Sequence, residues 1–403
     1  MNIIFLTVTL IHDIKTKGIY TDLMRKFRYE GHNVYIVSPH ERQFGIPTGL
    51  KDVDGVKILG VKTLNIQKTN IVEKGIGTVL LEDQFKRAIK KYLKGIQFDL
   101  ILYSTPPITL TNVVKYLKRS NPKAISYLLL KDIFPQNAVD LGMFSENSLF
   151  NWYFRRKEVE LYKTSDFIGC MSPANVEFLL KHNQFIDVHS VEIAPNSIEL
   201  VENESLTTEK RYDIRNKYHL PINKPIFIYG GNLGKPQGIP FLIKCLNANS
   251  SRTDCHFIVV GNGTEYGRLY AWYKDCKPTN VSFFAGLPKD DYDLLVQSCD
   301  VGLIFLDNRF TIPNYPSHLL SYMEHKMPII AATDVNTDIG TIAQENGYGY
   351  YCKSVDVEAF TRCVNKYTDN LETIKEMGEK AYGFMLDNYL VHHTYEKIMG
   401  HLR

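Results

Sequence analysis

The chain alternates between short apolar runs and longer segments in which apolar positions have helical spacing. Residues 2–8 form a continuous apolar run, residues 19–29 have the helical period, and residues 33–37 are apolar again. Continuous short runs are typical of strands buried on both faces of a parallel sheet. The pattern therefore predicts a β-α-β unit at the beginning of the chain.

The same alternation continues, and it restarts after a charged stretch at residues 198–222 that has no strand pattern. The further predicted strands are 100–104, 125–130, 167–171 and 190–193, then 226–229, 255–260, 281–284, 301–306, 329–332 and 348–352. Strands separated by helical segments, twice over, predict an α/β protein with two doubly wound parallel sheets. We place the domains at residues 1–200 and 201–385, followed by a C-terminal helix at 386–403 that returns to the first domain.

Composition narrows the class of protein. The 403 residues suffice for two domains, and 44% hydrophobic with 23% charged residues is ordinary for a globular chain. Seven cysteines without a C-x-x-C pair favour a reduced, cytoplasmic protein over a disulfide framework or a zinc site. No apolar stretch approaches the 18 residues of a membrane span.

Charge is distributed unevenly between the two halves. Residues 1–200 carry 26 Lys and Arg against 20 Asp and Glu, whereas the rest carry 21 against 24. The basic half suits an anionic membrane surface or a phosphate-bearing acceptor, although a solvated surface explains the surplus equally well. Residues 40–75 are irregular and predict a loop or short hairpins over the sheet. Within them Asp52-Val53-Asp54 imitates a D-x-D metal motif, and the neighbouring Gly55 favours a turn.

Two segments of the first half are candidates for function. Asp132 follows the strand 125–130, and residues just beyond the carboxyl end of a strand line the crevice of an open α/β sheet; a turn or helix cap is the alternative. Residues 149–164 combine aromatic side chains with Arg155, Arg156 and Lys157. That combination suits a helix at a membrane interface, and equally an amphipathic helix that packs on its own domain.

The most informative stretch is residues 226–239, FIYGGNLGKPQGIP, in which an apolar strand ends in glycines and a helix begins. Such a turn brings backbone N–H groups and a helix N-terminus to a phosphate. The spacing differs from the dinucleotide fingerprint G-x-G-x-x-G. Glycine is also used in turns simply for its positive φ, so the loop alone leaves both interpretations open.

The second half resembles a known family. The segments FIYGGNLGKPQGIPFLIKCL, FIVVGNGTE, VSFFAGLPKDDYDLLVQSCDVGLI and PSHLLSYMEHKMPIIAA are similar to the C-terminal domain of the group 1 (family 4) retaining glycosyltransferases. The first half adds GHNVYIVSP, KDIFP, EVELYKTSDFIGCMSP and IAPNSIEL in the same order. The loop pattern G-N-x-G-K-x-Q-G is most similar to the bacterial branch that adds deoxy-amino sugars to lipid-linked oligosaccharides in capsule and O-antigen assembly.

The resemblance implies a GT-B fold, in which two Rossmann-like doubly wound domains face each other across a deep cleft. It implies a hexosyl-type transferase that moves a sugar, with retention, from a nucleotide-diphospho-sugar to a lipid-linked or polysaccharide acceptor. We expect a UDP-linked donor, no cofactor, no metal and no nucleic-acid partner. We also expect a peripheral position on the inner face of the cytoplasmic membrane.

The resemblance also assigns roles to matching residues. The catalytic candidates are Asp132, facing the donor sugar, and Lys235, at the leaving diphosphate. The substrate-binding candidates share positions in the glycine-rich turns and at one helix start: Gly18, Gly231, Asn232, Gln237, Gly261, Gly263, Gly286, Leu287, Pro316, Ser317, His318, Leu319, Leu320, Ser321 and Glu324.

Two departures from the family pattern bear on activity. Most members have an E-x7-E motif that falls here on Pro313 and Ser321, with Glu324 one turn beyond Ser321. Many members place Arg and Lys where Asn232 and Gln237 stand, which leaves Lys235 as the main cation, with part of a second charge expected from His318. The alternatives are a GT-B epimerase or hydrolase, and a catalytically degenerate scaffold of a polysaccharide assembly complex.

Overall fold

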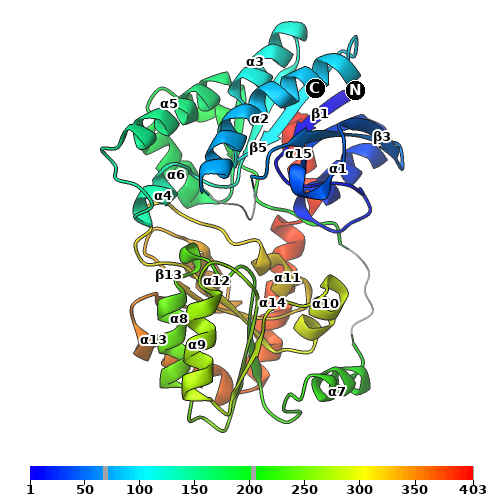
Figure 1. The fold of residues 1–403 in the computed structure, drawn as a ribbon. Coiled ribbons are helices and arrows are strands. Elements are labelled where there is room, and N and C mark those ends of the chain that lie inside the picture. The colour runs from blue at the N-terminus through cyan, green and yellow to red at the C-terminus, as the bar shows by residue number, and fades with distance from the viewer. Residues whose placement is uncertain (67–70, 201–205, 403) are drawn as a thin grey trace. The chain divides into compact units, whose positions relative to one another are not determined.

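The computed structural model describes residues 1–66, 71–200 and 206–402, and it divides into two compact units (Figure 1). Unit 1 comprises Met1–Glu199 and Leu390–Arg403, and unit 2 comprises Leu200–Tyr389. The C-terminal helix is thus part of unit 1, and the chain leaves unit 2 four residues later than the sequence boundary at 386.

Unit 1 is built on an eight-stranded sheet in the order β3-β4-β2-β1-β5-β6-β7-β8, with β3 antiparallel to β4 and the other neighbours parallel. The strands are β1 (Asn2–Leu6), β2 (Asn33–Glu41), β3 (Gly49–Val53), β4 (Val56–Thr63), β5 (Leu100–Ser104), β6 (Ile125–Leu130), β7 (Phe167–Cys170) and β8 (Val191–Ile193). The β1, β5 and β6 side chains are almost all buried, as continuous apolar runs require in a sheet covered on both faces.

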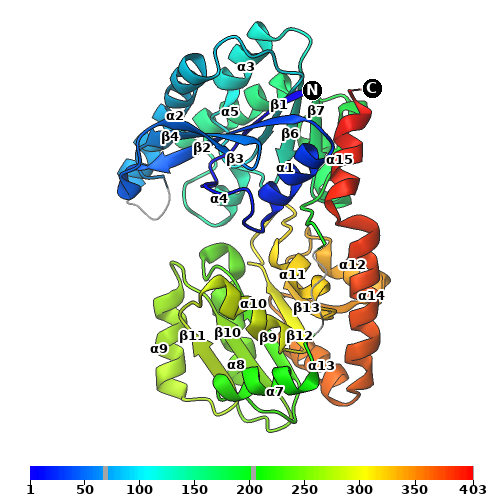
Figure 2. The same ribbon diagram turned by 90° about the vertical axis from the view of Figure 1, so that its right-hand side faces the viewer.

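Helices connect these strands and cover the sheet. They are α1 (Ile19–Tyr29), α2 (Ile71–Tyr92), α3 (Thr111–Ser120), α4 (Gln136–Asp140), α5 (Leu149–Thr164), α6 (Pro173–His182) and α15 (Val391–Gly400). Figure 2 shows α15 beside α1, where Ile398 and Met399 join the core cluster that contains Phe27. The N–H group of Val391 donates to the oxygen of Ile198, which ties the returning chain to this unit.

Unit 2 has a six-stranded, fully parallel sheet in the order β11-β10-β9-β12-β13-β14. The strands are β9 (Ile226–Gly230), β10 (His256–Val260), β11 (Val281–Phe284), β12 (Val301–Phe305), β13 (Ile329–Thr333) and β14 (Gly349–Lys353). In sequence order this is the Rossmann arrangement 3-2-1-4-5-6, whose direction reverses between β9 and β12. The carboxyl ends of these two strands therefore form the topological switch point, where ligands bind in such sheets.

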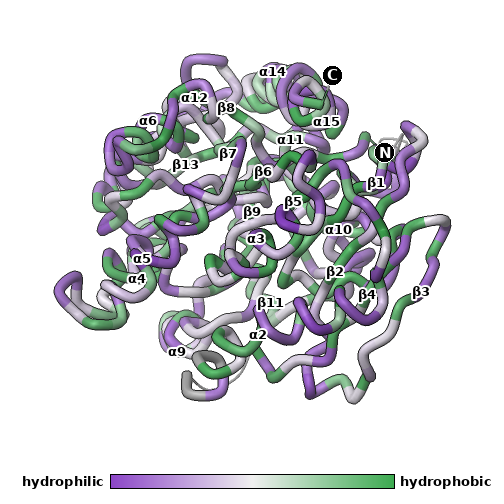
Figure 3. Tube along the Cα trace, turned by 90° about the horizontal axis from the view of Figure 1, so that it is seen from above, coloured by the Kyte–Doolittle hydropathy of each residue, from purple (hydrophilic) through white to green (hydrophobic). Residues whose placement is uncertain are grey.

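The helices of unit 2 are α7 (Thr208–Lys217), α8 (Ile239–Ala248), α9 (Tyr266–Cys276), α10 (Lys289–Gln297), α11 (His318–Glu324), α12 (Ile339–Glu345), α13 (Val357–Thr368) and α14 (Glu372–Asn388). Hydrophobic and hydrophilic residues alternate along the chain, as the colours of Figure 3 show. The apolar faces of α8 and α13 meet the strands in one core cluster that includes Phe227, Phe257 and Phe305.

Two segments are more ordered than a loop and a linker. Residues 40–75 contain the hairpin β3–β4, which is the short-hairpin alternative expected there, and β4 pairs in parallel with β2 over eight residues. The charged stretch 198–222, for which no helix was predicted, contains α7.

The Asp52-Val53-Asp54 segment is the turn of the β3–β4 hairpin. The Asp52 Oδ1 atom accepts the N–H of Gly55 at 2.9 Å, and Asp54 has a φ of 52°. Among the described residues, no group of three His, Cys, Asp or Glu side chains is placed to hold a metal ion. Helices long and apolar enough to cross a bilayer are likewise absent from the described ranges. All seven cysteines are free thiols.

Candidate functional site

The glycine loop, residues 230–238, lies at the switch point of unit 2 between β9 and α8. Its backbone is fastened to the turn after β10, because the N–H of Gly231 donates to the oxygen of Val260 at 3.0 Å and the N–H of Leu233 to that of Asn262 at 2.9 Å. The far end of the loop is held by the N–H of Asp307, which donates to the Pro236 oxygen at 2.9 Å. The loop is thus a fixed surface at the carboxyl edge of the sheet.

Gly261 and Gly263 allow this close packing of the two turns. A Cβ atom on Gly261 would lie 2.0 Å from the oxygen of Gly231, and one on Gly263 would lie 2.4 Å from the oxygen of Leu233. Real Cβ contacts are never that short, so any side chain at these positions would push the glycine loop away. The structure gives both residues a role in shaping the loop, while their expected contact with the nucleotide stays a prediction.

Some polar groups of the loop form hydrogen bonds within it, and others are left for a ligand. The Gln237 Oε1 atom accepts from Asn232 Nδ2 at 3.3 Å and from the N–H of Gly234 at 3.2 Å. Lys235 is exposed, and in the described part of the chain its ammonium group has no partner. Its own N–H and that of Asn232 also make no hydrogen bond within the described ranges. The loop therefore offers a ligand one cation and two backbone donors.

His318 begins α11 beside the glycine loop. Its ring packs edge-on against Tyr229 and Tyr322, with centroids 6.0 and 5.6 Å away, and its Nε2 atom is buried without a hydrogen-bond partner among the described residues. Burial lowers the pKa of His318 to about 4. The imidazole is therefore neutral at neutral pH in the protein without a ligand, and its expected partial charge beside a diphosphate stays a prediction.

The remaining substrate-binding candidates lie just before α11 or within it. Pro316 and Ser317 precede the helix, and their oxygens accept the N–H groups of Leu319 at 3.4 Å and Leu320 at 3.2 Å. These two backbone donors are therefore already engaged in local turns. Ser321 and Glu324 are one turn apart on the helix, and both are partly exposed.

Two tyrosines that the sequence did not single out position this helix and loop. The Tyr322 hydroxyl donates to the oxygen of Ile228 at 3.2 Å and accepts the N–H of Gly230 at 3.1 Å, which fixes α11 against β9. Tyr292 of α10 covers Gly230, where a Cβ atom would lie 2.0 Å from its hydroxyl oxygen. Gly286 and Leu287 lie between β11 and α10; Gly286 has a φ of 151°, which favours glycine there.

Asp132 lies at the carboxyl end of β6 in unit 1. The Thr105 Oγ1 atom accepts the N–H groups of Lys131 at 3.0 Å and Asp132 at 3.3 Å, so the end of β5 sets the position of the Asp132 backbone. The Asn137 side-chain amide donates to both carboxylate oxygens, at 2.8 and 2.9 Å. Burial nevertheless raises the pKa of Asp132 to about 6.

Gly18 belongs to the loop between β1 and α1, which encloses a cavity of about 390 Å³. Its φ of 171° is extended backbone, so glycine is not needed there for conformation. A Cβ atom would lie 3.3 Å from Thr21 Oγ1. Among the residues lining the same cavity, Tyr20 is close enough to Asp132 for the carboxylate charge to contribute to its raised pKa, although burial is the main cause.

In the aromatic–basic segment at the start of α5, some side chains pack on unit 1 and others are exposed to solvent. Phe154 packs against Phe134 with ring centroids 5.0 Å apart, and Arg155 bonds to Glu158 and to Asn183 of the neighbouring helix end. By contrast, three large apolar side chains of the first turn face solvent. These are Leu149, Phe150 and Trp152, with exposed fractions of 84%, 69% and 62%.

Comparison with known proteins bears on what this geometry does. Residues 210–384 match the family model of the group 1 glycosyl transferases. The match spans the glycine loop, the turns after β10 and β11, and α11. Unit 2, which carries the glycine loop, is therefore similar to the group 1 glycosyl transferases. Asp132 and Gly18 lie outside the matched range.

One relative and several solved structures are similar to the chain over most of its length. The chain is 21% identical over 345 residues to the probable glycosyltransferase WbjE of Pseudomonas aeruginosa, covering 83% of this chain and 82% of that protein. Among solved structures it is similar to sucrose-phosphate synthase of Thermosynechococcus elongatus, with a TM-score of 0.78, 15% identity, and 100% and 98% of the two chains covered. It is also similar to Anabaena HepE in complex with UDP, with a TM-score of 0.68, 14% identity, and 100% and 99% covered. These structures show the GT-B fold.

The packing of Gly261 gives a first prediction. Gly261→Ala introduces a Cβ atom at the oxygen of Gly231, so the glycine loop must shift and the free energy of unfolding should fall by about 1–3 kcal/mol. Gly267→Ala is the matched control, because a Cβ atom there meets nothing within 4 Å and alanine favours the helix α9. Urea unfolding of both variants checks this, and equal stability of the two would contradict the packing role.

Asp132 gives a second prediction, on pH. Its pKa of about 6 in the folded protein lies above the ordinary value near 3.9, so between these values the folded state holds a proton that the unfolded state has lost. The contribution of this group to stability therefore falls as pH rises from about 4 to about 6. Between these pH values, the free energy of unfolding should therefore fall more steeply in the wild type than in Asp132→Asn. The control variant Asp213→Asn, at an exposed site, should show the same pH dependence as the wild type. Identical pH dependence in the wild type and Asp132→Asn would refute the raised pKa of Asp132.

Proposed function

We propose that the protein is a glycosyltransferase that transfers a sugar from a UDP-linked donor, with retention, to a lipid-linked or polysaccharide acceptor in capsule or O-antigen synthesis. The observation that carries the proposal is the family match over residues 210–384, which falls on the Rossmann unit whose glycine loop and α11 meet at the switch point. UDP as the nucleotide is supported by the similar Anabaena HepE, which was solved with UDP and with UDP-glucose.

The chemistry is a same-face displacement. The bond from the anomeric carbon to the donor phosphate breaks, the acceptor oxygen bonds to that carbon on the same face, and the acceptor proton passes to the leaving phosphate oxygen. Negative charge grows on the diphosphate during this step, so groups aimed at it lower the barrier. In our proposal these groups are the Lys235 ammonium and the free N–H groups of Asn232 and Lys235.

The magnitudes are sufficient for a substantial effect. A hydrogen bond to a charged group contributes about 1.5–3 kcal/mol, and three of them act on the diphosphate in this scheme. His318 adds a neutral imidazole whose Nε2 atom has no partner in the described part of the chain. Binding of a diphosphate dianion beside that ring should raise the histidine pKa from about 4, because a nearby negative charge favours the imidazolium.

Other residues would hold the donor. Ser321 and Glu324 are our candidates for the ribose hydroxyls, since they share one face of α11. Asp132 is our candidate for orienting the sugar and stabilising positive charge at its ring. Its pKa of about 6 leaves most of the carboxylate ionised at neutral pH, as that role requires.

The acceptor side of the proposal rests on unit 1. Its surplus of Lys and Arg and the exposed Leu149, Phe150 and Trp152 suit attachment to an anionic bilayer, with the apolar side chains entering the interface. The Arg156 guanidinium lies 5.9 Å from the Trp152 ring, so charge and aromatic surface are adjacent. A lipid-linked acceptor at the inner face of the cytoplasmic membrane fits this arrangement.

Replacing Lys235 tests the catalytic proposal. Lys235→Ala removes the cation at the diphosphate and should lower turnover at least 100-fold, about 2.7 kcal/mol in activation free energy. The control is Lys244→Ala, an exposed lysine on α8 away from the loop. Release of UDP from UDP-sugars with lipid-linked acceptors measures the rate. An unchanged rate in Lys235→Ala removes this residue from the mechanism, and no turnover by wild type supports the scaffold alternative.

The exposed α5 residues test the membrane proposal. Phe150→Ala combined with Trp152→Ala should release the protein from anionic liposomes, because the inserted apolar area is lost while Arg155 keeps its structural contacts. Tyr29→Ala, exposed on α1, is the control. Sedimentation with liposomes gives the bound fraction, and undiminished binding of the double variant would leave this surface without a membrane role.

A further inference from the structure

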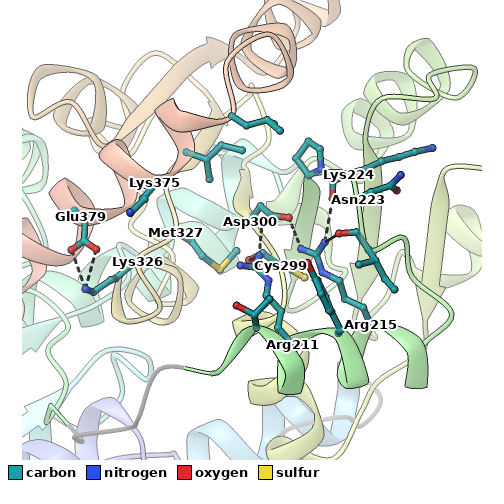
Figure 4. A pocket seen from close by; sticks show the side chains of 16 residues that line it. Arg211, Arg215, Asn223, Lys224, Cys299, Asp300, Lys326, Met327, Lys375 and Glu379 are labelled. Carbon is teal, nitrogen blue, oxygen red and sulfur yellow. Dashed lines mark hydrogen bonds and ion pairs between the residues drawn. The ribbon is translucent and has the colours of Figure 1, made fainter.

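Two largely buried carboxylates of this chain have their charge offset in different ways. In unit 2, Asp300 bonds to Arg211 through Oδ1 and to Arg215 through Oδ2, the latter at 2.7 Å, beside the pocket drawn in Figure 4. Two guanidinium groups therefore offset that charge. In unit 1, Asp132 forms no ion pair with any described residue, and a neutral amide, that of Asn137, bonds to it instead. The ionised form of Asp132 thus depends on a hydrogen-bond donor and not on a cation.

The turn that connects β6 to α4 brings Asn137 over Asp132. The N–H of Asn137 donates to the oxygen of Ile133 at 3.1 Å, and Gln136 Nε2 bonds to Asp140 Oδ1 at 2.9 Å along α4. The turn places the Asn137 Nδ2 atom 2.8 Å from Asp132 Oδ1 and 2.9 Å from Oδ2. The amide is therefore held by its own backbone and directed at both carboxylate oxygens.

The orientation of the Asn137 amide favours one protonation state of Asp132. Its Nδ2 atom only donates, so protonation of either carboxylate oxygen removes an acceptor that this nitrogen uses. The Oδ1 atom of the same amide is buried without a hydrogen-bond partner among the described residues. If the amide were turned over, Oδ1 would face the carboxyl group, and only the protonated acid could bond to it. The observed arrangement therefore stabilises the ionised form.

The titratable groups around Asp132 do not take over this role. Burial raises the pKa of Asp132 to about 6, whereas the bonds from Asn137 and from the N–H of Ile133 lower it. The Lys131 side chain is engaged elsewhere, because its Nζ atom donates to a backbone oxygen just beyond β8 at 3.0 Å. Tyr20 of α1 is close to Asp132, and burial together with that carboxylate charge raises the pKa of the tyrosine, which stays neutral. Asn137 is thus the side chain that offsets the cost of burying the charge.

We propose that Asn137 is a positioning residue for the transfer reaction, one that keeps the Asp132 carboxylate ionised and fixed at the carboxyl end of β6. The inference rests on the proposed function, in which this carboxylate orients the donor sugar and stabilises positive charge at its ring. Asp132 can stabilise positive charge only while it is ionised, and hydrogen bonds to the charged form of an acid favour that form. Asn137 therefore acts on the reaction through Asp132 and not through contact with the substrate.

Unfolding measured across pH tests this inference without any substrate. In Asn137→Leu both bonds to the carboxylate are lost, so the pKa of Asp132 in the folded state should rise by about one unit or more. The contribution of Asp132 to stability falls as pH rises through the folded-state pKa, so this fall should extend from about pH 6 to about pH 7 or above. In Asn137→Leu combined with Asp132→Asn the extension should disappear. The matched control is Asn112→Ala, which removes an amide bond to Glu82 at an exposed site of unit 1 and should leave the upper limit near pH 6.

Two results of this measurement would overturn the inference. One is an unchanged upper limit in Asn137→Leu, and the other is the same extension in the double variant, which would assign the titration to another group. Asn137→Ala removes the same two bonds without adding bulk, so it carries the same test if the leucine variant does not fold.

The pH profile of turnover then separates positioning from a merely structural role. If loss of the Asp132 proton is required, the acid limb of kcat/KM should move from about pH 6 in the wild type to about pH 7 or above in Asn137→Leu. At about pH 8.5 the carboxylate is ionised in both proteins, so kcat should differ by less than about threefold. An equal loss of rate at every pH would contradict the positioning role. Absence of turnover by the wild type would contradict the proposed function, whereas the unfolding measurement decides the effect of Asn137 on Asp132 without donor or acceptor.

Discussion

The site of unit 2 depends on the close approach of two backbone turns at the switch point of the sheet. The oxygen of Gly231 occupies the space that a side chain on Gly261 would need, and the Leu233 oxygen does the same at Gly263. Because these turns lock together, the glycine loop needs few side-chain contacts to hold its shape. Gln237 then braces it from inside, and the loop keeps its outward groups, Lys235 and two N–H donors, unpaired within the described ranges.

The glycine loop carries fewer positive charges than the loop of the family that the sequence resembles. At the two positions where many members of that family have Arg and Lys, this chain has Asn232 and Gln237. His318 is kept neutral by its burial against Tyr229 and Tyr322. A single fixed ammonium group and oriented backbone dipoles must then stabilise a leaving diphosphate in the proposed reaction. Preorganised donors of this kind cost no reorganisation at the moment of reaction, which makes a small number of them effective.

The sequence predicts the sheets well because parallel strands buried on both faces are continuous apolar runs. The run 226–229 corresponds to β9, and the glycine turn after it forms the loop that was expected there. The hairpin β3–β4 was expected only as an alternative to a loop, because it is an edge element with many exposed polar residues. The helix α7 was missed because it is polar on all sides, and it is held by Arg215 and Asp300, a contact that only the tertiary structure creates.

The positions of the glycine turns in the candidate site were predictable from the sequence, whereas the electrostatic surroundings of its side chains were not. Glycines at strand ends mark the turns, but which of them permits close packing depends on the neighbouring turn. The neutrality of His318 and the raised pKa of Asp132 follow from burial, which no local pattern encodes. In the sequence, Tyr322 cannot be told from an ordinary apolar-face residue of a helix. Its hydroxyl bonds to Ile228 and Gly230 form only when α11 packs on β9.

The most direct measurement is a calorimetric titration of the purified protein with UDP, GDP and ADP without added metal. The account predicts that UDP binds, that its affinity exceeds that of the other two, and that binding needs no divalent ion. Absence of binding by all three nucleotides would contradict the central claim that the switch point of unit 2 is a nucleotide-sugar site.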